Sequence, residues 1–158
     1  MKTKQEQLES LKTRIKTIEH QLARIKRRIE TIKLQYPLTV KTVATLTESQ
    51  EEKFDSALYR FSQVQKLMVS KVFPLFLEVA GEPVEDFTFI DKLNYLERMN
   101  VIESADAWIE LRKLRNEIAH DYEEGTSDRH VRILSAFLKA IPVLEGALHR
   151  IQQRISHF

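Results

Sequence analysis

Cysteine is absent from the 158 residues, and glycine and proline are scarce, with three and four copies. The lack of cysteine excludes disulfides, thiol nucleophiles, thiolate zinc sites and cysteine-ligated iron–sulfur clusters. So few glycines and prolines favour long helices over a turn-rich β fold. The chain has no run of about 18 apolar residues and no apolar segment behind its polar start, so neither a transmembrane helix nor a secretory signal is predicted. We therefore expect a cytoplasmic protein that does not interact with membranes.

The length and composition are typical of one globular domain, with 42% apolar and 30% charged residues. The net charge of +2 is unevenly distributed, because residues 1–35 contain ten Lys and Arg but only four Glu. The rest of the chain is therefore net negative. We expect one domain overall, in which residues 1–36 form a long basic amphipathic helix and residues 37–158 form a helical bundle.

The first segment has a heptad pattern of apolar residues at alternating steps of three and four. These residues are Leu8, Leu11, Ile15, Ile18, Leu22, Ile25, Ile29 and Ile32. Two interpretations are open: the helix packs on its own domain or antiparallel to another helix, or it forms a dimeric coiled coil. The flanking positions are mostly basic, so a parallel copy would meet like charge, and packing within the domain is favoured.

Four further helices follow from local start and stop signals. The first helix is expected to end at Tyr36-Pro37, and residues 37–47 form a connector. The expected helix starts are Thr47 or Ser49, Thr88 with Asp91, Ser104, and Ser127 or Asp128; Pro74 kinks the second helix, and Gly81 with Pro83 ends it. No alternating strand pattern competes, so the sequence predicts an all-α, up-and-down bundle of about five helices.

Common enzyme signatures are missing: there is no Walker loop, H-E-x-x-H or G-x-S-x-G sequence. Most histidines lie among charged residues, as solvated surface histidines do. Glu145 and His149 lie one helical turn apart, but two ligands without a third indicate a surface pair more than a metal site. No metal site is predicted.

The fourth helix differs because Arg115 interrupts its apolar stripe, where a guanidinium must either be paired or face a cleft. At 100° per residue, Asn116 lies within about 40° of His120, whereas Arg115 is about 140° from His120. Arg115 and His120 therefore flank one face without converging. Two such helices related by a two-fold axis would surround one groove with two Arg and two His.

The segment Arg115-Asn-Glu-Ile-Ala-His120-Asp-Tyr122 resembles the R-x4-H-x-Y motif of HEPN-domain proteins, specifically the HepT-like toxin ribonucleases of HEPN/MNT toxin–antitoxin pairs. An Arg and a His separated by four residues are common by chance, but the added Asn116 and Tyr122 make the match rare. The motif-specific part covers residues 111–122, and helix order extends the likeness to residues 50–156. The long first helix goes beyond the minimal domain of that family.

The resemblance implies a toxin that cleaves RNA in a dimeric cleft without a metal or cofactor, through attack of the ribose 2′-hydroxyl on the adjacent phosphate. Arg115 and His120 are the implied catalytic residues. The guanidinium of an arginine is always charged and can donate two parallel hydrogen bonds to a phosphate, and a histidine exchanges protons near neutral pH. Asn116 is expected to orient His120 or contact RNA. The implied partner is an MNT-type nucleotidyltransferase antitoxin, which in this family transfers AMP to the tyrosine that Tyr122 matches.

Other interpretations remain open at this stage. In a structural interpretation, Arg115 pairs with Glu110, Glu117 or a neighbouring helix, His120 caps carbonyls and Tyr122 packs at the helix end. The alternative function is a non-catalytic HEPN module that binds nucleotide or RNA for a nucleotidyltransferase. A third interpretation is an interaction protein organised by a coiled coil over residues 5–33.

Overall fold

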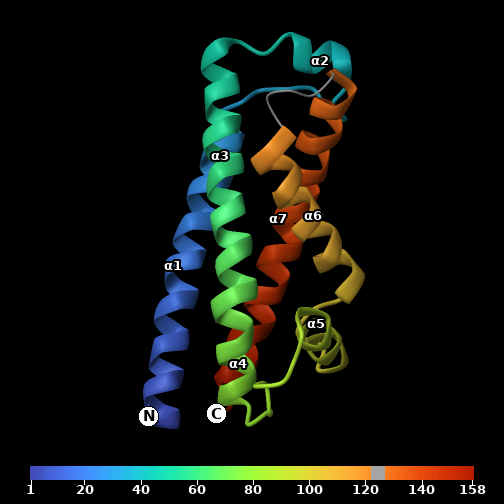
Figure 1. The fold of residues 1–158 in the computed structure, drawn as a ribbon. Helices are drawn as coiled ribbons and strands as arrows, with labels where there is room; N and C mark the ends of the chain where they lie inside the picture. The colour runs from blue at the N-terminus through green and yellow to red at the C-terminus, as the bar shows by residue number, and fades with distance from the viewer. Residues whose placement is uncertain (122–126) are drawn as a thin grey trace.

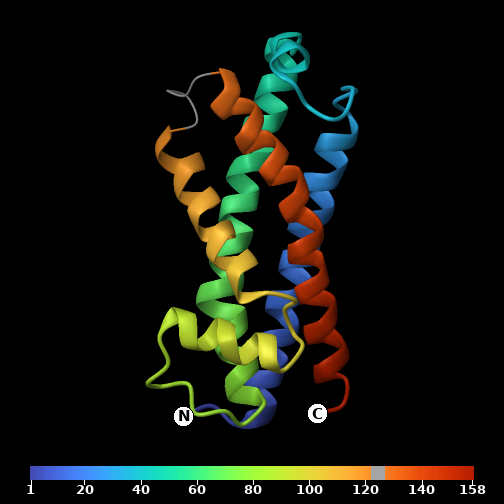
Figure 2. The same ribbon diagram turned by 90° about the vertical axis from the view of Figure 1, so that its right-hand side faces the viewer.

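Four long rods pack side by side in an up-and-down bundle, which confirms the predicted all-α architecture (Figures 1 and 2). The computed structural model describes residues 1–121 and 127–158, and no strand occurs among them. The rods are α1 (Lys4–Glu30), α3 (Glu48–Leu67) with its continuation, α6 (Ala105–Asp121) and α7 (Ser127–Ile155). Around the bundle, α1 contacts α3, α3 contacts α6, α6 contacts α7, and α7 contacts α1. The groove between α1 and α3 and the seam between α3 and α6 therefore lie on opposite sides of α3.

The first helix packs within its own chain. Its heptad residues from Leu8 to Ile25 are buried against α3, α4 (Phe73–Val79) and α7, so this stripe is not free to form a coiled coil with a second copy. The helix ends at Glu30, earlier than Pro37 indicated. The reason is local, since the backbone N–H and the hydroxyl of Thr31 both donate to the carbonyl of Arg28, with the hydroxyl at 2.6 Å. The chain then turns, and Ile32 is buried in the turn.

The second rod consists of α3, a π-helical segment η1 (Met68–Val72) and α4 (Phe73–Val79). It begins at Thr47, the first of the two predicted starts, and not at Ser49. The Thr47 hydroxyl accepts from the N–H of Gln50, and the Gln50 side chain accepts from the Thr47 N–H. The widened π turn ends at Val72, two residues before Pro74. Proline has no N–H for the carbonyl one turn before it and its ring crowds that carbonyl, so the predicted kink takes the form of a π turn.

The remaining helices complete the bundle. The connector over residues 37–47 contains a short helix, α2 (Val40–Ala44), that the sequence pattern did not predict. Helix α5 (Phe89–Arg98) starts at the predicted Thr88 and Asp91 capping box and packs against α6. Ser104 caps α6, since its Oγ accepts from the N–H of Ala107 at 3.2 Å. Both chain termini lie at the end of the bundle opposite α2 (Figure 1).

Aromatic side chains fill the core between the rods. Phe61 of α3 meets Phe137 of α7 edge-on, with ring centroids 5.4 Å apart, and Phe73 meets Trp108 of α6 in the same way at 4.7 Å. Trp108 is thus a core residue, as its helical spacing indicated. In the part of the chain that is described, no helix is both long enough and apolar enough to cross a membrane.

Candidate functional site at the seam between α3 and α6

Arg115 lies in the seam between α6 and α3. Its Nη1 donates a hydrogen bond of 3.0 Å to Oε1 of Gln65 on α3, and the side chain is half-buried. Gln65 is fully buried and is the one polar residue within the core of the described chain. Arg115 is therefore held on a neutral amide that the apolar core fixes in place.

The carboxylates nearest in sequence to Arg115 are engaged elsewhere. Glu110 pairs with Lys113 at 3.1 Å. Glu117 faces α7, where it accepts hydrogen bonds from both terminal nitrogens of Arg132, one of them at 3.1 Å. The structural interpretation offered Glu110, Glu117 or a neighbouring helix as the partner of Arg115; pairing with either glutamate is wrong, and the contact with a neighbouring helix is present, through Gln65 of α3. Of the residues that the structure describes, Gln65 is the only side chain that accepts a hydrogen bond from Arg115.

The electrostatics follow from this arrangement. Burial lowers the pKa of Arg115, and the positive charge of Arg112 lowers it further. Arg112 is itself held over the ring of Phe89, 4.6 Å from its centroid. Arginine stays protonated in proteins even with a lowered pKa, so the seam keeps a full positive charge that no described carboxylate cancels.

Two more polar atoms lie in the seam. The Nε2 of Gln65 and the Oγ of Ser62 are buried and have no hydrogen-bond partner among the described residues. The two residues are three positions apart, on the same face of α3. Ser62, Gln65 and Arg115, which we call the polar seam, thus present one fixed cation and two unused polar groups. Buried polar groups without partners are costly in folded proteins and therefore call for an explanation.

His120 and Asn116 lie on the exposed side of α6. No hydrogen bond joins Asn116 to His120, or His120 to Arg115, among the residues described, so one chain does not assemble these groups into a compact site. This agrees with the angle of about 140° between Arg115 and His120 around the helix. Tyr122 lies outside the described residues.

Glu145 and His149, the weak metal candidate of the sequence, lie on the surface of α7 and do not form a metal site with a third ligand among the described residues. Glu145 pairs with Lys26 of α1 at 3.2 Å, and His149 is exposed. Within residues 1–121 and 127–158, no group of three or more His, Asp or Glu side chains is placed to hold a metal ion.

Gln65 is the site residue that sequence reasoning missed. It follows the apolar Val64 and lies on the side of α3 that faces the core. A single polar residue among the apolar residues of that side was the signal that could have identified it. Helical periodicity gives the direction of Gln65 but not the identity of its neighbour on another helix. No family model, curated protein or solved structure that was compared with the chain matches it.

Proposed function

We propose that this protein is a metal-independent endoribonuclease of the HEPN type and the toxin of a toxin–antitoxin pair. The observation that best supports this is the state of Arg115, which is anchored by Gln65 but not neutralised by a carboxylate. A purely structural arginine in a core is normally paired with a carboxylate, because an uncompensated charge costs several kcal/mol. A guanidinium held by an amide keeps its charge for a ligand that is itself an anion, such as an RNA phosphate.

The proposed reaction needs no nucleophile from the protein. The 2′-oxygen of the substrate bonds to phosphorus, and the bond from phosphorus to the 5′-oxygen breaks, which leaves a 2′,3′-cyclic phosphate. The His120 of one subunit accepts the proton of the 2′-hydroxyl, and solvent water donates the proton that the leaving 5′-oxygen takes up. Arg115 stabilises the negative charge that builds on the phosphate, and Asn116 contacts the RNA or orients His120.

The proposed active unit is a homodimer. Arg115 in the seam and His120 on the exposed side of α6 are separated around one helix, so a second copy is needed to bring an Arg and a His together. If so, Arg115→Ala and His120→Ala proteins, each inactive, should regain activity when they are unfolded and refolded together. A mixture of equal parts should reach roughly a quarter of wild-type activity, since half of the dimers are mixed and each has one intact site of two. No recovery, together with a monomer in sedimentation, would contradict the composite site.

Control of the toxin by a nucleotidyltransferase is the second part of the proposal. Tyr122 follows Arg115 by seven residues, which places it only about 20° away around an ideal helix. Its phenol oxygen would bond to the α-phosphorus of ATP as pyrophosphate leaves, which places a negative phosphodiester beside Arg115. Mass spectrometry after incubation with the partner and ATP should find AMP on the Tyr122 peptide and a matching loss of ribonuclease activity. Silencing of a Tyr122→Phe variant would contradict this mechanism.

The decisive experiment incubates the purified protein with total RNA and with tRNA in EDTA. We expect cleavage that leaves 2′,3′-cyclic phosphate ends and that disappears in His120→Ala. RNA binding without cleavage would instead favour the non-catalytic HEPN module. A strict magnesium requirement, or equal cleavage of all-deoxy substrates, would refute the proposed chemistry.

A further inference from the structure

The two flanks of α1 differ in how their charges are satisfied. On the flank that faces α7, Lys26 pairs with Glu145 at 3.2 Å, and Glu19 accepts a hydrogen bond from Gln152. On the flank that faces α3, the charged residues are Arg14, Arg24 and Arg28, and none of them has an ion-pair partner in the described chain. One flank therefore binds its neighbour through complementary groups, and the other keeps its cations free.

The second rod adds cations to the same groove. Lys53 and Arg60 of α3 and Lys71 of η1 lie on the side of the rod that faces α1. Arg60 donates to the Oε1 of Gln21 on α1 at 3.0 Å, a neutral partner again. No described carboxylate makes an ion pair with any of the three. We call the following six residues the basic groove: Arg14, Arg24, Arg28, Lys53, Arg60 and Lys71.

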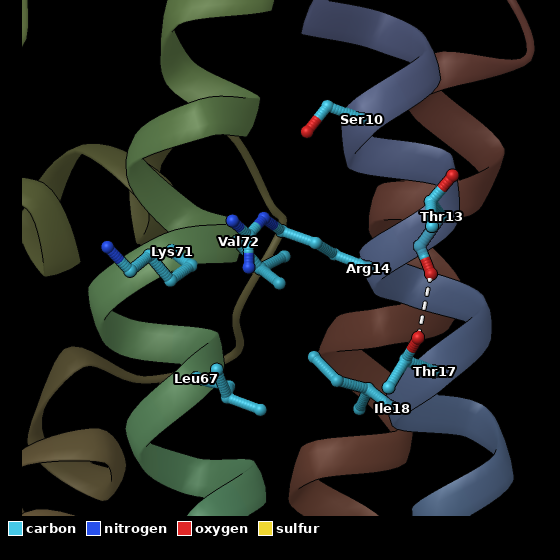
Figure 3. A pocket seen from close by; sticks show the side chains of 8 residues that line it. All are labelled: Ser10, Thr13, Arg14, Thr17, Ile18, Leu67, Lys71 and Val72. Carbon is cyan, nitrogen blue, oxygen red and sulfur yellow. Dashed lines mark hydrogen bonds between the residues drawn. The ribbon is translucent and has the colours of Figure 1, made fainter.

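The basic groove is hollowed at both ends. A hollow of about 380 Å³ is lined by Arg14 and Lys71 together with the hydroxyls of Ser10, Thr13 and Thr17. Figure 3 shows the Arg14 side chain extending from α1 toward η1 and ending beside Val72. A second hollow of about 300 Å³ is lined by Arg24, Arg28 and Lys53, with Arg27 and Thr31. From Arg14 to Arg28 the groove runs for about 21 Å along α1, at 1.5 Å per residue.

The outer surface of α3 connects this groove to the polar seam. Residues 56–77 contain no Asp or Glu, so no carboxylate of this stretch separates the two cationic surfaces. Tyr59 lies on this surface, 100° around the helix from Arg60 on the side toward α6. Its side chain is 67% exposed, which is unusual for a large aromatic residue. An exposed aromatic ring between two cationic surfaces is the arrangement on which single-stranded nucleic acids stack their bases.

We infer that the basic groove binds the phosphate backbone of single-stranded RNA outside the cleavage site, and that Tyr59 stacks on a base where the strand crosses α3 toward Arg115. The inference rests on the proposed function for the identity of the polymer. A membrane surface fits the groove less well, because all of its cations except the exposed Lys71 are half-buried between the helices. Apart from Tyr59, the large apolar residues exposed in the described chain lie outside the groove: Met1, Tyr36, Val40, Ile90 and Phe158.

The test measures RNA binding separately from cleavage. In the His120→Ala background, anisotropy of a labelled, unstructured RNA of about 20 nucleotides gives Kd across a salt series. Arg24→Gln/Arg28→Gln should weaken binding at least tenfold and reduce the slope of log Kd against log salt by about 1.4, because each phosphate that is no longer neutralised accounts for about 0.7. The control Arg98→Gln/Lys139→Gln removes the same charge from α5 and α7 and should change Kd by less than about twofold.

Tyr59→Ala should weaken binding about tenfold without changing the salt slope, whereas Tyr59→Phe should bind as wild type. In the active protein, Arg24→Gln/Arg28→Gln should lose kcat/KM on the long RNA but keep it on a tetranucleotide, which is too short to reach the groove. Circular dichroism melts confirm that each variant folds.

Unchanged RNA affinity of the groove variant would overturn the inference. So would groove-dependent binding of phosphatidylserine vesicles, or of polyglutamate, as tight as that of RNA. If the protein does not cleave RNA, the binding series still shows whether the basic groove binds RNA. The failures of the two proposals are therefore distinguishable.

Discussion

Replacing Gln65 tests whether Arg115 is held for catalysis or for folding. In Gln65→Leu, a side chain of similar size loses the Oε1 atom that accepts from Arg115 at 3.0 Å. Loss of a hydrogen bond to a charged group costs about 1.5–3 kcal/mol, but Arg115 is only half-buried and regains some hydration. The same substitution removes the buried Nε2, which has no partner and whose burial costs about 1–3 kcal/mol. The two terms nearly cancel, so we expect the free energy of unfolding to change by less than about 1 kcal/mol.

The effect on activity should be much larger than the effect on stability. Without the Gln65 carbonyl, the guanidinium is free to rotate out of the seam, and misplacement of a catalytic group by about 1 Å is enough to cost about 100-fold. We expect kcat/KM of Gln65→Leu to fall by about that factor.

Gln65→Glu separates position from charge. The shape and the acceptor are retained, but the introduced carboxylate lies within hydrogen-bond distance of Arg115 and cancels its charge. A phosphate then meets a neutral pair, and the removal of one such electrostatic interaction typically costs about 10²–10³ in rate. Gln65→Asn is the matched control for the length of the side chain, because it keeps a neutral amide that is too short to reach Arg115.

The assay is cleavage of a short fluorogenic RNA, combined with urea denaturation of each variant. Wild-type activity in Gln65→Glu would mean that the charge of Arg115 is not used in the reaction. A loss of several kcal/mol in Gln65→Leu, with activity per folded molecule intact, would mean that the Gln65–Arg115 contact is structural.

Three further predictions follow from described contacts. Alanine at Arg115 or His120 should abolish cleavage. The melting temperature of His120→Ala should stay near that of wild type, whereas Arg115→Ala leaves the buried Oε1 of Gln65 without its donor and should lower stability by about 1–3 kcal/mol, both measured by circular dichroism. Glu117→Gln should lower stability by about 0.5–1 kcal/mol at pH 7. Hydrogen bonding from Arg132 lowers the pKa of Glu117 in the folded protein, so this contribution is present above the ordinary carboxyl pKa and disappears as pH falls through the lowered value; urea denaturation at pH 7 and pH 3 checks it. Phe137→Ala, which removes the ring packed on Phe61, should cost about 3–5 kcal/mol in the same measurement.

Helix starts were predictable because their signals are local. The capping boxes at Thr47 and Thr88 join residues three positions apart, so the sequence contains both partners of each hydrogen bond. Helix ends were less predictable. Pro37 limits how far α1 can extend, but the helix stops at Glu30, where Thr31 satisfies the carbonyl of Arg28. The short α2 was missed because its capping box uses Thr42 in place of the usual Glu or Gln.

The candidate site was predictable only within α6. Periodicity indicated that Arg115 interrupts an apolar stripe and that His120 points elsewhere, and both features are present in the structure. The partner of Arg115 was not predictable, because Gln65 is 50 residues away on α3. Which face of α3 points toward α6 depends on how the whole core packs. The same holds for the basic groove, since heptad spacing aligns Arg14, Arg24 and Arg28 but does not show which neighbour they face.

The distribution of carboxylates links the two cationic surfaces. On the α7 side of the bundle, acidic residues join helices: Glu117 binds Arg132 and Glu145 binds Lys26. On the α3 side the two arginines that bridge helices are held instead by glutamines, Arg115 by Gln65 and Arg60 by Gln21, while Glu78 of α4, a carboxylate that joins α1 to this rod, accepts from the neutral Gln7. An amide bridges two helices as a carboxylate does but leaves the arginine charge uncancelled, so positive potential accumulates along α3. For fold stability alone a carboxylate would serve in either place; the use of glutamine in both is explained if this side must attract an anion.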